Sequence, residues 1–581
     1  MPIRALDPEA RPGNVLGAHS GTPGAHLSPT ATATSSPPVG APTSPGFGPG
    51  VPALAREAPA RRLSICLINP RFEPSYWGFD YALPLYPGDK RCTMITGALP
   101  TIAGLVHPDH EVVLLDENIE DIDFEALRRF DLVGVTGMIV QKKRMREILL
   151  RLKAMGIYAI VGGAYASVDR DFFEREDLAR ALFSGEAEET FPEFLADFAA
   201  GRPTKTYYEQ ADRTDMSRAP RPRYDLLKVD RYASGALQFS RGCPFQCEFC
   251  DIIVTFGRKP RTKPVAQVIS ELDDMVRAGF LSVFIVDDNF IGNKKAAKEL
   301  LEALVVWQET NGYPVRLSTE ASLNLADDPR LLELMYRANF RHVFMGIETP
   351  RMESLKETKK FQNTHGDSLD DKLARIQNAG IDIHAGFIVG FDADDDKIFE
   401  DQFQFIQRNG ILLAMVGMLG AIPKTPLYER LQREGRLVDD PNLNFVPKQM
   451  TREQLQRGYW RLVERLYTPE AFLDRYFRSY RLPEYHRKRK EISIKAAEGK
   501  LVPTLAYALL LIVALVRTLV HDGSLFRVGG VYLRQFFTKN LKYRRDVIGL
   551  AQFANRCVTH WHFYKFTRLA IAGRLRLFNS G

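Results

Sequence analysis

Residues 241–250 read RGCPFQCEFC and place Cys243, Cys247 and Cys250 in a Cys-x3-Cys-x2-Cys spacing. They follow residues 237–240, a short apolar stretch that is typical of a strand. Thiolates are soft ligands that favour iron–sulfur clusters, zinc and copper(I), and a tight loop with three of them can hold three corners of a four-iron cluster. The fourth iron is then open to a small molecule. We therefore predict that these cysteines are metal ligands at a catalytic centre.

Two other uses of these cysteines fit the sequence less well. A structural zinc site takes four protein ligands, but no fourth cysteine lies near the loop, and His110 and His342 are distant along the chain. Disulfides need an oxidising compartment, whereas this chain has six cysteines in 581 residues and starts without the apolar stretch of a signal peptide. The remaining cysteines are predicted to be buried thiols: Cys66, Cys92 and Cys557.

The first segment differs in composition from the rest of the chain. Residues 1–60 are rich in Ala, Gly, Ser and Thr and hold 12 of the 35 prolines, with Phe47 as their only aromatic residue. Such a segment cannot bury enough apolar surface to offset the entropy of ordering it. We therefore expect a disordered tail over residues 1–60, with an interaction segment as the alternative.

Residues 61–205 are predicted to form a doubly wound α/β domain. Apolar runs alternate there with helical patterns, which indicates a parallel sheet covered on both faces. The predicted strands are residues 63–69, 111–116, 132–136, 158–162 and 181–184. Ligands of open sheets bind outside the carboxyl ends of the strands, where glycine lets the backbone approach closely, although tight turns use glycine too. The candidate binding residues at these ends are Thr136, Gly137, Gly162, Gly163, Gly185 and Glu186.

Residues 225–447 are predicted to form a partial (β/α)6 barrel. The six predicted strands are residues 237–240, 282–286, 316–320, 342–345, 383–389 and 415–420. Chemistry in barrels of parallel strands belongs at the carboxyl ends. Besides the cysteines, these ends carry the carboxylates Asp288, Glu320 and Glu348. Each of the three could act on a ligand, or could serve as a helix cap or a salt bridge.

Residues 448–581 are predicted to form a mainly helical, basic C-terminal domain. From Leu473 onward there are 21 Lys or Arg against 6 Asp or Glu, a net charge of +15 in a chain whose total is +7. A basic end favours nucleic acid or an anionic membrane surface, and attraction of this kind is screened by salt. Residues 501–516 carry no charge, but a membrane span needs about twenty apolar residues. We expect a buried or interfacial helix there, with a span as the lesser alternative.

The cysteine loop and the two alternating regions resemble the cobalamin-dependent radical S-adenosylmethionine methyltransferase family over about residues 63–447. The resemblance implies a four-iron cluster on the cysteines, S-adenosylmethionine on the open iron, and cobalamin, in its methylated form, at the strand ends of the first domain. It also implies that Asp288, Glu320 and Glu348 contact the methionyl or ribose parts of S-adenosylmethionine. The backbone around Phe249 is then expected to meet the adenine.

One departure from the family pattern lies in residues 115–119. Many cobalamin domains have an Asp-x-His-x-x-Gly loop whose histidine binds cobalt from below, whereas this chain has Asn118 at that position. We therefore expect no histidine ligand on cobalt. The four cations that follow the cysteine loop are expected to neutralise the cluster and cofactor phosphates, with a solvated face as the alternative: Arg258, Lys259, Arg261 and Lys263.

Four parts of the chain resemble the hopanoid C-2 methylase group of this family: residues 69–74, the aromatic stretch 76–92, residues 360–363 and the basic, apolar tail. This resemblance implies radical transfer of a methyl group to an unactivated carbon, C-2 of a hopanoid lipid. The aromatic stretch is expected to cap cobalamin or to wall an apolar pocket. The expected partners are a lipid or other small-molecule substrate, an external electron donor and a membrane surface met from the cytoplasm, and no nucleic acid.

Other functions stay open at this point. The same domains could serve a methylase with another substrate, or a radical oxidoreductase or cyclase without net methyl transfer. A nucleic-acid modifier fits the basic tail, but the methylthiolating relatives carry a second cysteine triad, which Cys66 and Cys92 cannot supply. A non-enzymatic electron carrier or cluster sensor would not need a whole barrel with polar strand ends.

Overall fold

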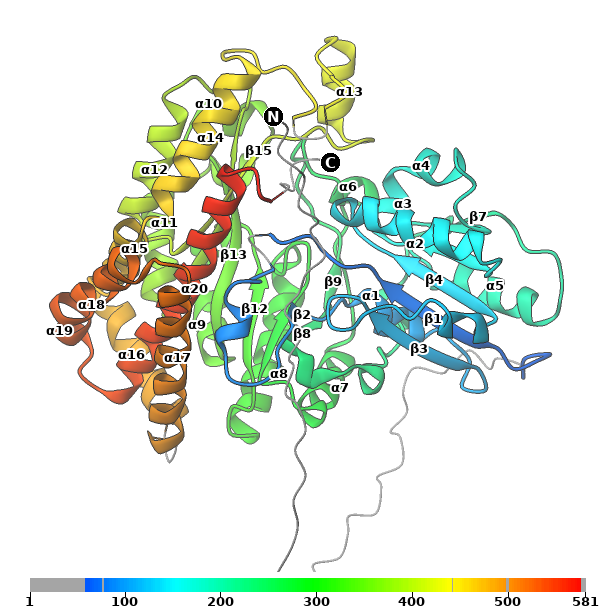
Figure 1. Cartoon of the computed structure of the whole chain (residues 1–581), viewed down its shortest axis with the longest axis horizontal. Helices are drawn as coiled ribbons and strands as arrows, with labels where there is room; N and C mark the ends of the chain where they lie inside the picture. The colour runs from blue at the N-terminus through cyan, green and yellow to red at the C-terminus, as the bar shows by residue number, and fades with distance from the viewer. Residues whose placement is uncertain (1–57, 76–77, 441–442, 498–500, 576–581) are drawn as a thin grey trace, which may run out of the picture. The chain divides into compact units, whose positions relative to one another are not determined.

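The computed structural model describes residues 58–75, 78–440, 443–497 and 501–575, with side chains left out at 492–497 and 501. Residues 1–57, which hold almost all of the predicted tail, lie outside the described residues. Two parallel sheets, each flanked by helices, precede a set of C-terminal helices (Figure 1). This arrangement confirms the predicted α/β fold class with a mainly helical C-terminal region.

The first sheet has the order β3-β1-β4-β5-β6-β7, with every neighbouring pair parallel. Its predicted strands appear within one residue, because apolar runs buried on both faces give a clear signal. The short, polar β7 was not predicted. The strands are β1 (Ser64–Asn69), β3 (Glu111–Asp116), β4 (Leu132–Thr136), β5 (Ala159–Gly162), β6 (Ala181–Ser184) and β7 (Tyr207–Glu209). The helices around it are α1 (Ala98–Ala103), α2 (Lys142–Ala154), α3 (Ala164–Val168), α4 (Arg170–Glu174) and α5 (Thr190–Ala199).

The second sheet has the order β15-β14-β13-β12-β11-β8-β2, again all parallel. Six of its strands are the predicted barrel strands, and β2 is a seventh. The strands are β2 (Cys92–Met94), β8 (Tyr232–Leu237), β11 (Ser282–Ile285), β12 (Arg316–Glu320), β13 (Phe340–Glu348), β14 (Asp382–Val389) and β15 (Leu413–Met418). The helices of this region are α6 (Ile252–Thr255), α7 (Val265–Ala278), α8 (Lys294–Thr310), α9 (Pro329–Arg337), α10 (Met352–Glu357), α11 (Leu369–Asn378), α12 (Ile398–Arg408) and α13 (Pro426–Arg433).

The first barrel strand lies earlier than predicted. The prediction placed it at residues 237–240, but β8 ends at Leu237 and a separate strand, β9 (Ser240–Arg241), pairs with β10 (Arg261–Thr262). The buried carboxylate of Asp287 accepts hydrogen bonds from the backbone N–H groups of Phe239 and Ser240, at 2.7 and 2.9 Å. These bonds replace the sheet pairing that the apolar pattern suggested.

Strand β2 comes from the segment predicted to belong to the first domain, yet it pairs with β8 of the second sheet. The aromatic residues before it lie against the C-terminal helices. The Phe79 ring stacks on His562 at a centroid distance of 5.1 Å, and the Tyr81 N–H donates to His562 Nδ1 at 3.3 Å. In its described part, the aromatic stretch therefore connects the barrel to the C-terminal region. Residues 76 and 77 lie outside the description.

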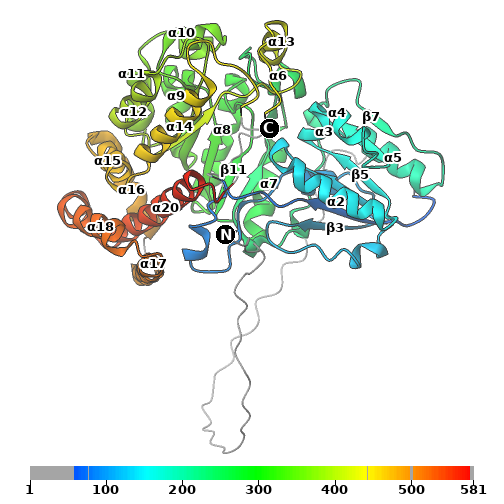
Figure 2. The ribbon, with the colours of Figure 1, turned by 45° about the horizontal axis from the view of Figure 1, so that its top comes forward.

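The C-terminal helices share one hydrophobic core with the barrel. For example, the Tyr467 ring stacks on Phe563 at 4.5 Å while its hydroxyl donates to the backbone oxygen of Ala414 in β15 at 2.7 Å. Figures 1 and 2 both show α17 beside α20. The helices are α14 (Arg452–Leu466), α15 (Pro469–Ser479), α16 (Pro483–Ala497), α17 (Leu501–His521), α18 (Gly530–Gln535), α19 (Leu541–Tyr543) and α20 (Val547–Ile571).

Candidate functional site

The cysteine loop follows β9 and is fixed by its backbone. Gly242 has a φ of +95°, and a Cβ there would lie 2.9 Å from the carbonyl oxygen of Lys259 and 3.0 Å from that of Gly257. Glycine is therefore required at this position. The Gly242 N–H donates to Asp288 at 2.7 Å, and the Cys243 N–H donates to the Gly257 carbonyl at 3.2 Å. These bonds hold the start of the loop against the end of β11.

The three cysteine side chains influence one another electrostatically. Burial raises the pKa of Cys243 and raises that of Cys250 to about 12, and the nearby Cys247 contributes to both shifts. Iron has to displace these protons, because the thiolate is the ligand form. Among the described residues, no three His, Cys, Asp or Glu side chains converge as the ligands of a single metal ion do. A four-iron cluster needs a different arrangement, since each thiolate binds a separate iron, and the triad offers thiolates for three of the four irons.

Two of the predicted carboxylates lie close together beside the loop. Burial raises the pKa of Asp288 to about 6, and burial together with the charge of Asp288 raises the pKa of Glu320 to about 7. Within the ranges that the structure covers, no hydrogen bond or ion pair to the Glu320 side chain is found. Glu320 is therefore a half-buried acid to which a cationic ligand could bind.

The third carboxylate is paired with Lys360, which the sequence indicated only as part of the family-like stretch 360–363. Glu348 has a φ of +66°, and its Oε1 lies 2.6 Å from Nζ of Lys360. Lys360 Nζ also lies 5.8 Å from the centroid of the Phe249 ring. Burial alone would lower the pKa of Lys360, but the charges of Glu348 and Cys247 raise it. A left-handed backbone in a residue other than glycine is strained, and such strain clusters at functional sites.

The turn after Lys360 reaches the cluster loop. The 3-10 turn Phe361–Asn363 places Nε2 of Gln362 at 3.4 Å from Sγ of Cys247. Asn363 anchors the turn, because its Nδ2 donates to the carbonyl oxygens of Gly346 and Ile347 at 3.0 and 3.1 Å. The sequence pointed to this segment only as a family-like stretch. Its place after the strand that carries Glu348 was the one signal that could have identified it as part of the site.

Four of the predicted cobalamin contacts come together at the ends of β4 and β5. Thr136 pairs with Gly162 in the sheet register. Gly163 has a φ of +94°, and a Cβ there would lie 2.3 Å from Oγ1 of Thr136 and 3.2 Å from the backbone nitrogen of Gly137. Gly185, at the end of β6, has a φ of +72°, and a Cβ there would meet no described atom within 4 Å. Glycine is thus required at Gly163 by the close packing of the two strand ends, while Gly185 presents open backbone that a large, flat cofactor could approach.

The side chain of Glu186 binds groups of the protein. Its side chain is buried and accepts from Arg241 at 2.8 Å, from Arg261 at 3.0 Å and from the Thr214 N–H at 2.7 Å. Glu188 pairs with Arg241 as well, at 2.7 Å. Because both arginines lie on the hairpin of β9 and β10, this cluster joins the first domain to the strand that leads into the cysteine loop. The oxygens of Glu186 are thus engaged by groups of the protein, and its contact with cobalamin stays a prediction.

The basic residues after the cysteine loop likewise serve the fold. Lys263 forms a buried ion pair with Glu271 at 2.8 Å, and Arg261 is held by Glu186. Arg258 donates to the carbonyl oxygen of Pro244 at 3.2 Å. The expectation that these cations neutralise a cofactor is therefore wrong for Arg261 and Lys263.

Asn118, which stands where a cobalt-binding histidine would be, holds the loop after β1. Its Oδ1 accepts from the Phe72 N–H at 2.9 Å and its Nδ2 donates to the Pro70 carbonyl at 3.3 Å. Gln141 Nε2 donates to Asn69 Oδ1 at 3.0 Å in the same network. This polar network fills the point between β1 and β4 where the strand order reverses, the usual ligand position of doubly wound sheets.

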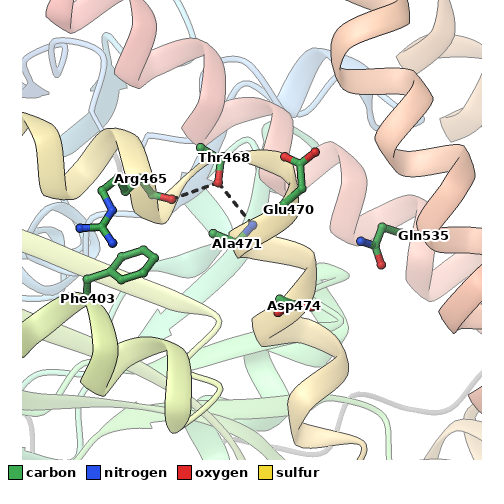
Figure 3. Close-up of a pocket in the computed structure, with 7 residues that line it drawn as sticks. All are labelled: Phe403, Arg465, Thr468, Glu470, Ala471, Asp474 and Gln535. Atoms are coloured by element: carbon green, nitrogen blue, oxygen red, sulfur yellow. Dashed lines mark hydrogen bonds between the residues drawn. The ribbon is translucent and has the colours of Figure 1, made fainter. Parts of the chain in front are cut away.

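A hollow of about 440 Å³ lies on the C-terminal helices (Figure 3). It is lined by Phe403, Arg465, Thr468, Glu470, Ala471, Asp474 and Gln535. Its charged side chains are already paired: Arg465 with Glu400 at 2.6 Å, Glu470 with Arg534 at 3.5 Å, and Asp474 with Lys539 at 2.5 Å. It therefore offers less to a charged ligand than the ends of the barrel strands do.

Comparisons with known proteins identify relatives of this chain. The radical SAM superfamily model matches residues 237–406, and a domain of unknown function, DUF4070, matches residues 425–574. The chain is 41% identical over 423 residues to an uncharacterized methyltransferase of Synechocystis sp., covering 71% of this chain and 78% of the relative. It is 37% identical over 414 residues to the hopanoid C-2 methylase of Rhodopseudomonas palustris, with coverage of 71% and 78%.

Solved structures show the same fold. The cobalamin-dependent S-adenosylmethionine radical enzyme OxsB, with aqua-cobalamin and S-adenosylmethionine bound, matches with a TM-score of 0.55 at 15% identity, covering 88% of this chain and 80% of OxsB. The radical S-adenosylmethionine methyltransferase TsrM from Kitasatospora setae matches with a TM-score of 0.52 at 16% identity, covering 75% and 99%. The chain belongs to the radical S-adenosylmethionine methyltransferase family of these relatives. The family and the enzyme class predicted from the cysteine loop are thereby confirmed.

Proposed function

We propose that this methyltransferase adds a methyl group to C-2 of a hopanoid lipid. The observation that carries the substrate is the 37% identity to a hopanoid C-2 methylase over most of both chains. The ring methylenes of such a lipid are unactivated, so no acid or base can turn them into a nucleophile. Radical chemistry is the route that reaches them. The relative at 41% identity is named only as a methyltransferase, so another acceptor is the second candidate.

The cysteine triad would hold a four-iron cluster, with S-adenosylmethionine at the open iron. Together these groups supply an adenosyl radical, and methylcobalamin supplies the methyl group. Ionised Glu320, which has no protein partner in the described ranges, would stabilise the positive charge of S-adenosylmethionine. Asp288 lies beside it, and Lys360 offsets the negative charge of the thiolates.

Cobalamin would lie at the strand ends that carry Thr136, Gly137, Gly162, Gly163 and Gly185, where the backbone of Gly185 is open. No histidine is expected on cobalt, because Asn118 occupies that position and its amide is bonded to the loop after β1. Paramagnetic resonance of the cob(II)alamin form should then lack hyperfine splitting from an axial imidazole nitrogen. If that splitting is present, this assignment fails.

We also propose that the enzyme works in the cytoplasm at the membrane surface, where a hopanoid resides, and that an external donor reduces its cluster. The net charge of +15 from Leu473 onward favours an anionic surface. This basic region is packed into the same core as the barrel, so the charge and the active site belong to one body.

The test of the substrate is gas chromatography with mass spectrometry of lipids from cells with and without this chain. Deletion should remove 2-methylhopanoids and leave their unmethylated parents intact. Complementation with the intact gene should restore the methylated lipids, whereas a gene with Cys243, Cys247 and Cys250 replaced by Ala should not. Methylated lipids that persist after deletion, or a loss of methylation at C-3, would disprove the hopanoid C-2 assignment.

A further inference from the structure

The C-terminal helices expose a strip of apolar side chains. On α17, all of these side chains except Leu510 follow each other at intervals of three and four residues, which is the spacing of one helical face. Ten of the 17 exposed large apolar side chains among the described residues lie between 502 and 537. We call them the apolar strip: Val502, Leu505, Leu509, Leu510, Val513, Val516, Val520, Phe526, Leu533 and Phe537.

The strip is exposed well beyond what scattered surface residues show. Phe526 is 93% exposed, Val502 79%, and Leu509 51%. A contiguous apolar patch of this kind on a folded protein marks a surface that meets another protein or a membrane. The strip is therefore expected to contact a partner that buries apolar side chains along the whole of α17.

The opposite face of α17 is also apolar, but it is used within the protein. Ala508, Leu511, Leu515 and Leu519 are buried, and the three leucines belong to the core that α17 shares with α20. By length and composition alone, Val502–His521 could cross a membrane. A crossing α17 would have to carry α20 with it, and α20 bears Lys565 and Arg568, whose charges are costly in hydrocarbon. The packing therefore favours a helix that lies in the membrane plane.

The charges in and around the strip favour an anionic membrane as its partner. Residues 501–545 hold seven Lys or Arg and a single acid, Asp522, which is paired with Lys565. Arg517, Arg527 and Lys542 are exposed. An apolar face bordered by cations is the pattern of helices that lie in the interface of an anionic bilayer. A protein partner would need a matching apolar groove with acidic edges, which nothing in this chain requires.

We propose that the apolar strip inserts into the acyl region of one membrane leaflet, with α17 parallel to the surface. The inference rests on the proposed function, which puts the enzyme at the membrane surface. It adds that the apolar strip is the face that enters the lipid. Burial of apolar side chains is not screened by salt, whereas attraction between charges is. Binding should therefore survive high salt, in contrast to the screened surface contact expected from the sequence.

The first experiment measures flotation of the reconstituted enzyme with vesicles of phosphatidylcholine, alone or mixed with phosphatidylglycerol. The intact enzyme should bind both kinds in about 1 M salt, where charges are screened beyond about 3 Å. Leu509→Asp with Val513→Asp should lower partitioning about 100-fold or more, since each change removes a large apolar side chain that would be buried in the lipid. The matched control is Leu281→Asp with Val306→Asp, at apolar positions 71% and 63% exposed but away from the strip; it should bind as the intact enzyme does.

The second experiment reads the depth of the helix. Tryptophan is placed singly at Val502, Val513 and Val520, and its quenching by lipids brominated at different acyl depths is compared with that of the intact enzyme. A helix in the membrane plane gives the same shallow depth at all three positions. A spanning helix gives a deep middle and shallow ends, and that result would overturn the proposal.

Further outcomes separate this inference from the proposed function. Release of the intact enzyme by salt, or unchanged binding of the Leu509 and Val513 variant, would refute the insertion. The insertion would also be refuted if the intact enzyme dimerises in solution through the strip and does not float with either kind of vesicle. The strip variant should still methylate hopanoid dispersed in detergent. If the intact enzyme binds vesicles yet leaves detergent-dispersed hopanoid unmethylated, the substrate assignment fails while the insertion stands.

Discussion

The side-chain amide of Gln362 donates a hydrogen bond to Sγ of Cys247, with 3.4 Å between nitrogen and sulfur. The glutamine is buried, and its Oε1 has no partner among the described residues. Its hydrogen-bonding capacity is thus directed at the thiolate. Hydrogen bonds to the sulfurs of iron–sulfur clusters are one of the means by which a protein sets the reduction potential.

Replacing Gln362 with Leu is expected to lower the midpoint potential of the cluster. The reduced cluster carries one more negative charge, so loss of a donor destabilises it more than the oxidised cluster. A difference of about 1 kcal/mol corresponds to roughly 40 mV for one electron. Redox titration followed by paramagnetic resonance measures the shift. As a control, Gln308→Leu removes a buried amide that donates to Val315 and Ala338, and it should cost stability without moving the potential.

Replacing Cys243, Cys247 and Cys250 with Ala should abolish cluster binding. Iron and sulfide analysis after anaerobic reconstitution should fall from four irons per chain to none, and 5'-deoxyadenosine formation should stop with it. The matched control is a chain in which Cys66, Cys92 and Cys557 are replaced by Ala, since these thiols lie outside the loop. Full iron content in the first variant, or its loss in the control, would show that the ligands are assigned wrongly.

The acid Glu320 should make stability depend on pH. Its pKa is about 7 in the folded protein against an ordinary value of 4.5, so the unfolded chain ionises first and stability is lost as pH rises from about 4.5 to 7. The loss between pH 5 and pH 8 is about 2–3 kcal/mol, at roughly 1.4 kcal/mol per pKa unit. Urea unfolding of Glu320→Gln should lack this part of the dependence, whereas Glu299→Gln, at an exposed position of α8, should keep it.

The same ionisation has a functional readout. Above pH 7 the Glu320 carboxylate is charged, so the affinity of the reconstituted enzyme for S-adenosylmethionine should rise between pH 6 and pH 8. Calorimetry of Glu320→Gln should show a flatter profile. An equal rise in both proteins would mean that another group binds the positive charge.

Replacing Glu186 with Gln should destabilise the protein. Arg241 is buried and would keep Glu188 as its single remaining carboxylate, while Arg261 would lose its only ion pair found in the described ranges. Breaking a buried pair costs about 3–5 kcal/mol. Denaturant unfolding measures the loss, and Glu189→Gln, at an exposed position of the same loop, serves as the control. If the variant is as stable as the intact protein but binds less cobalamin, the original prediction for Glu186 is restored.

The sequence by itself determined the sheet architecture and predicted the cluster ligands. Ligand chemistry depends on residue type and local spacing, and all three cysteines lie within eight residues of one loop. The strands of both sheets are short, largely buried segments between helical patterns, so β4 and β12 were predicted at the bounds the structure gives them. Both features are local, which is why neighbouring residues were enough to reveal them.

Tertiary structure alone decided which carboxylates are free of ion pairs with the protein and can bind a ligand. It also decided which strands share a sheet. Glu186 meets arginines 55 and 75 residues away, and β2 pairs with a strand that starts 140 residues after it. The sequence could place Glu186, Glu320 and Glu348 at strand ends, but it could not tell which of them has an ion partner. The same holds for α17, whose two apolar faces look alike in sequence. Only packing against α20 buries one face and leaves the other to the solvent, because burial depends on what the fold brings alongside.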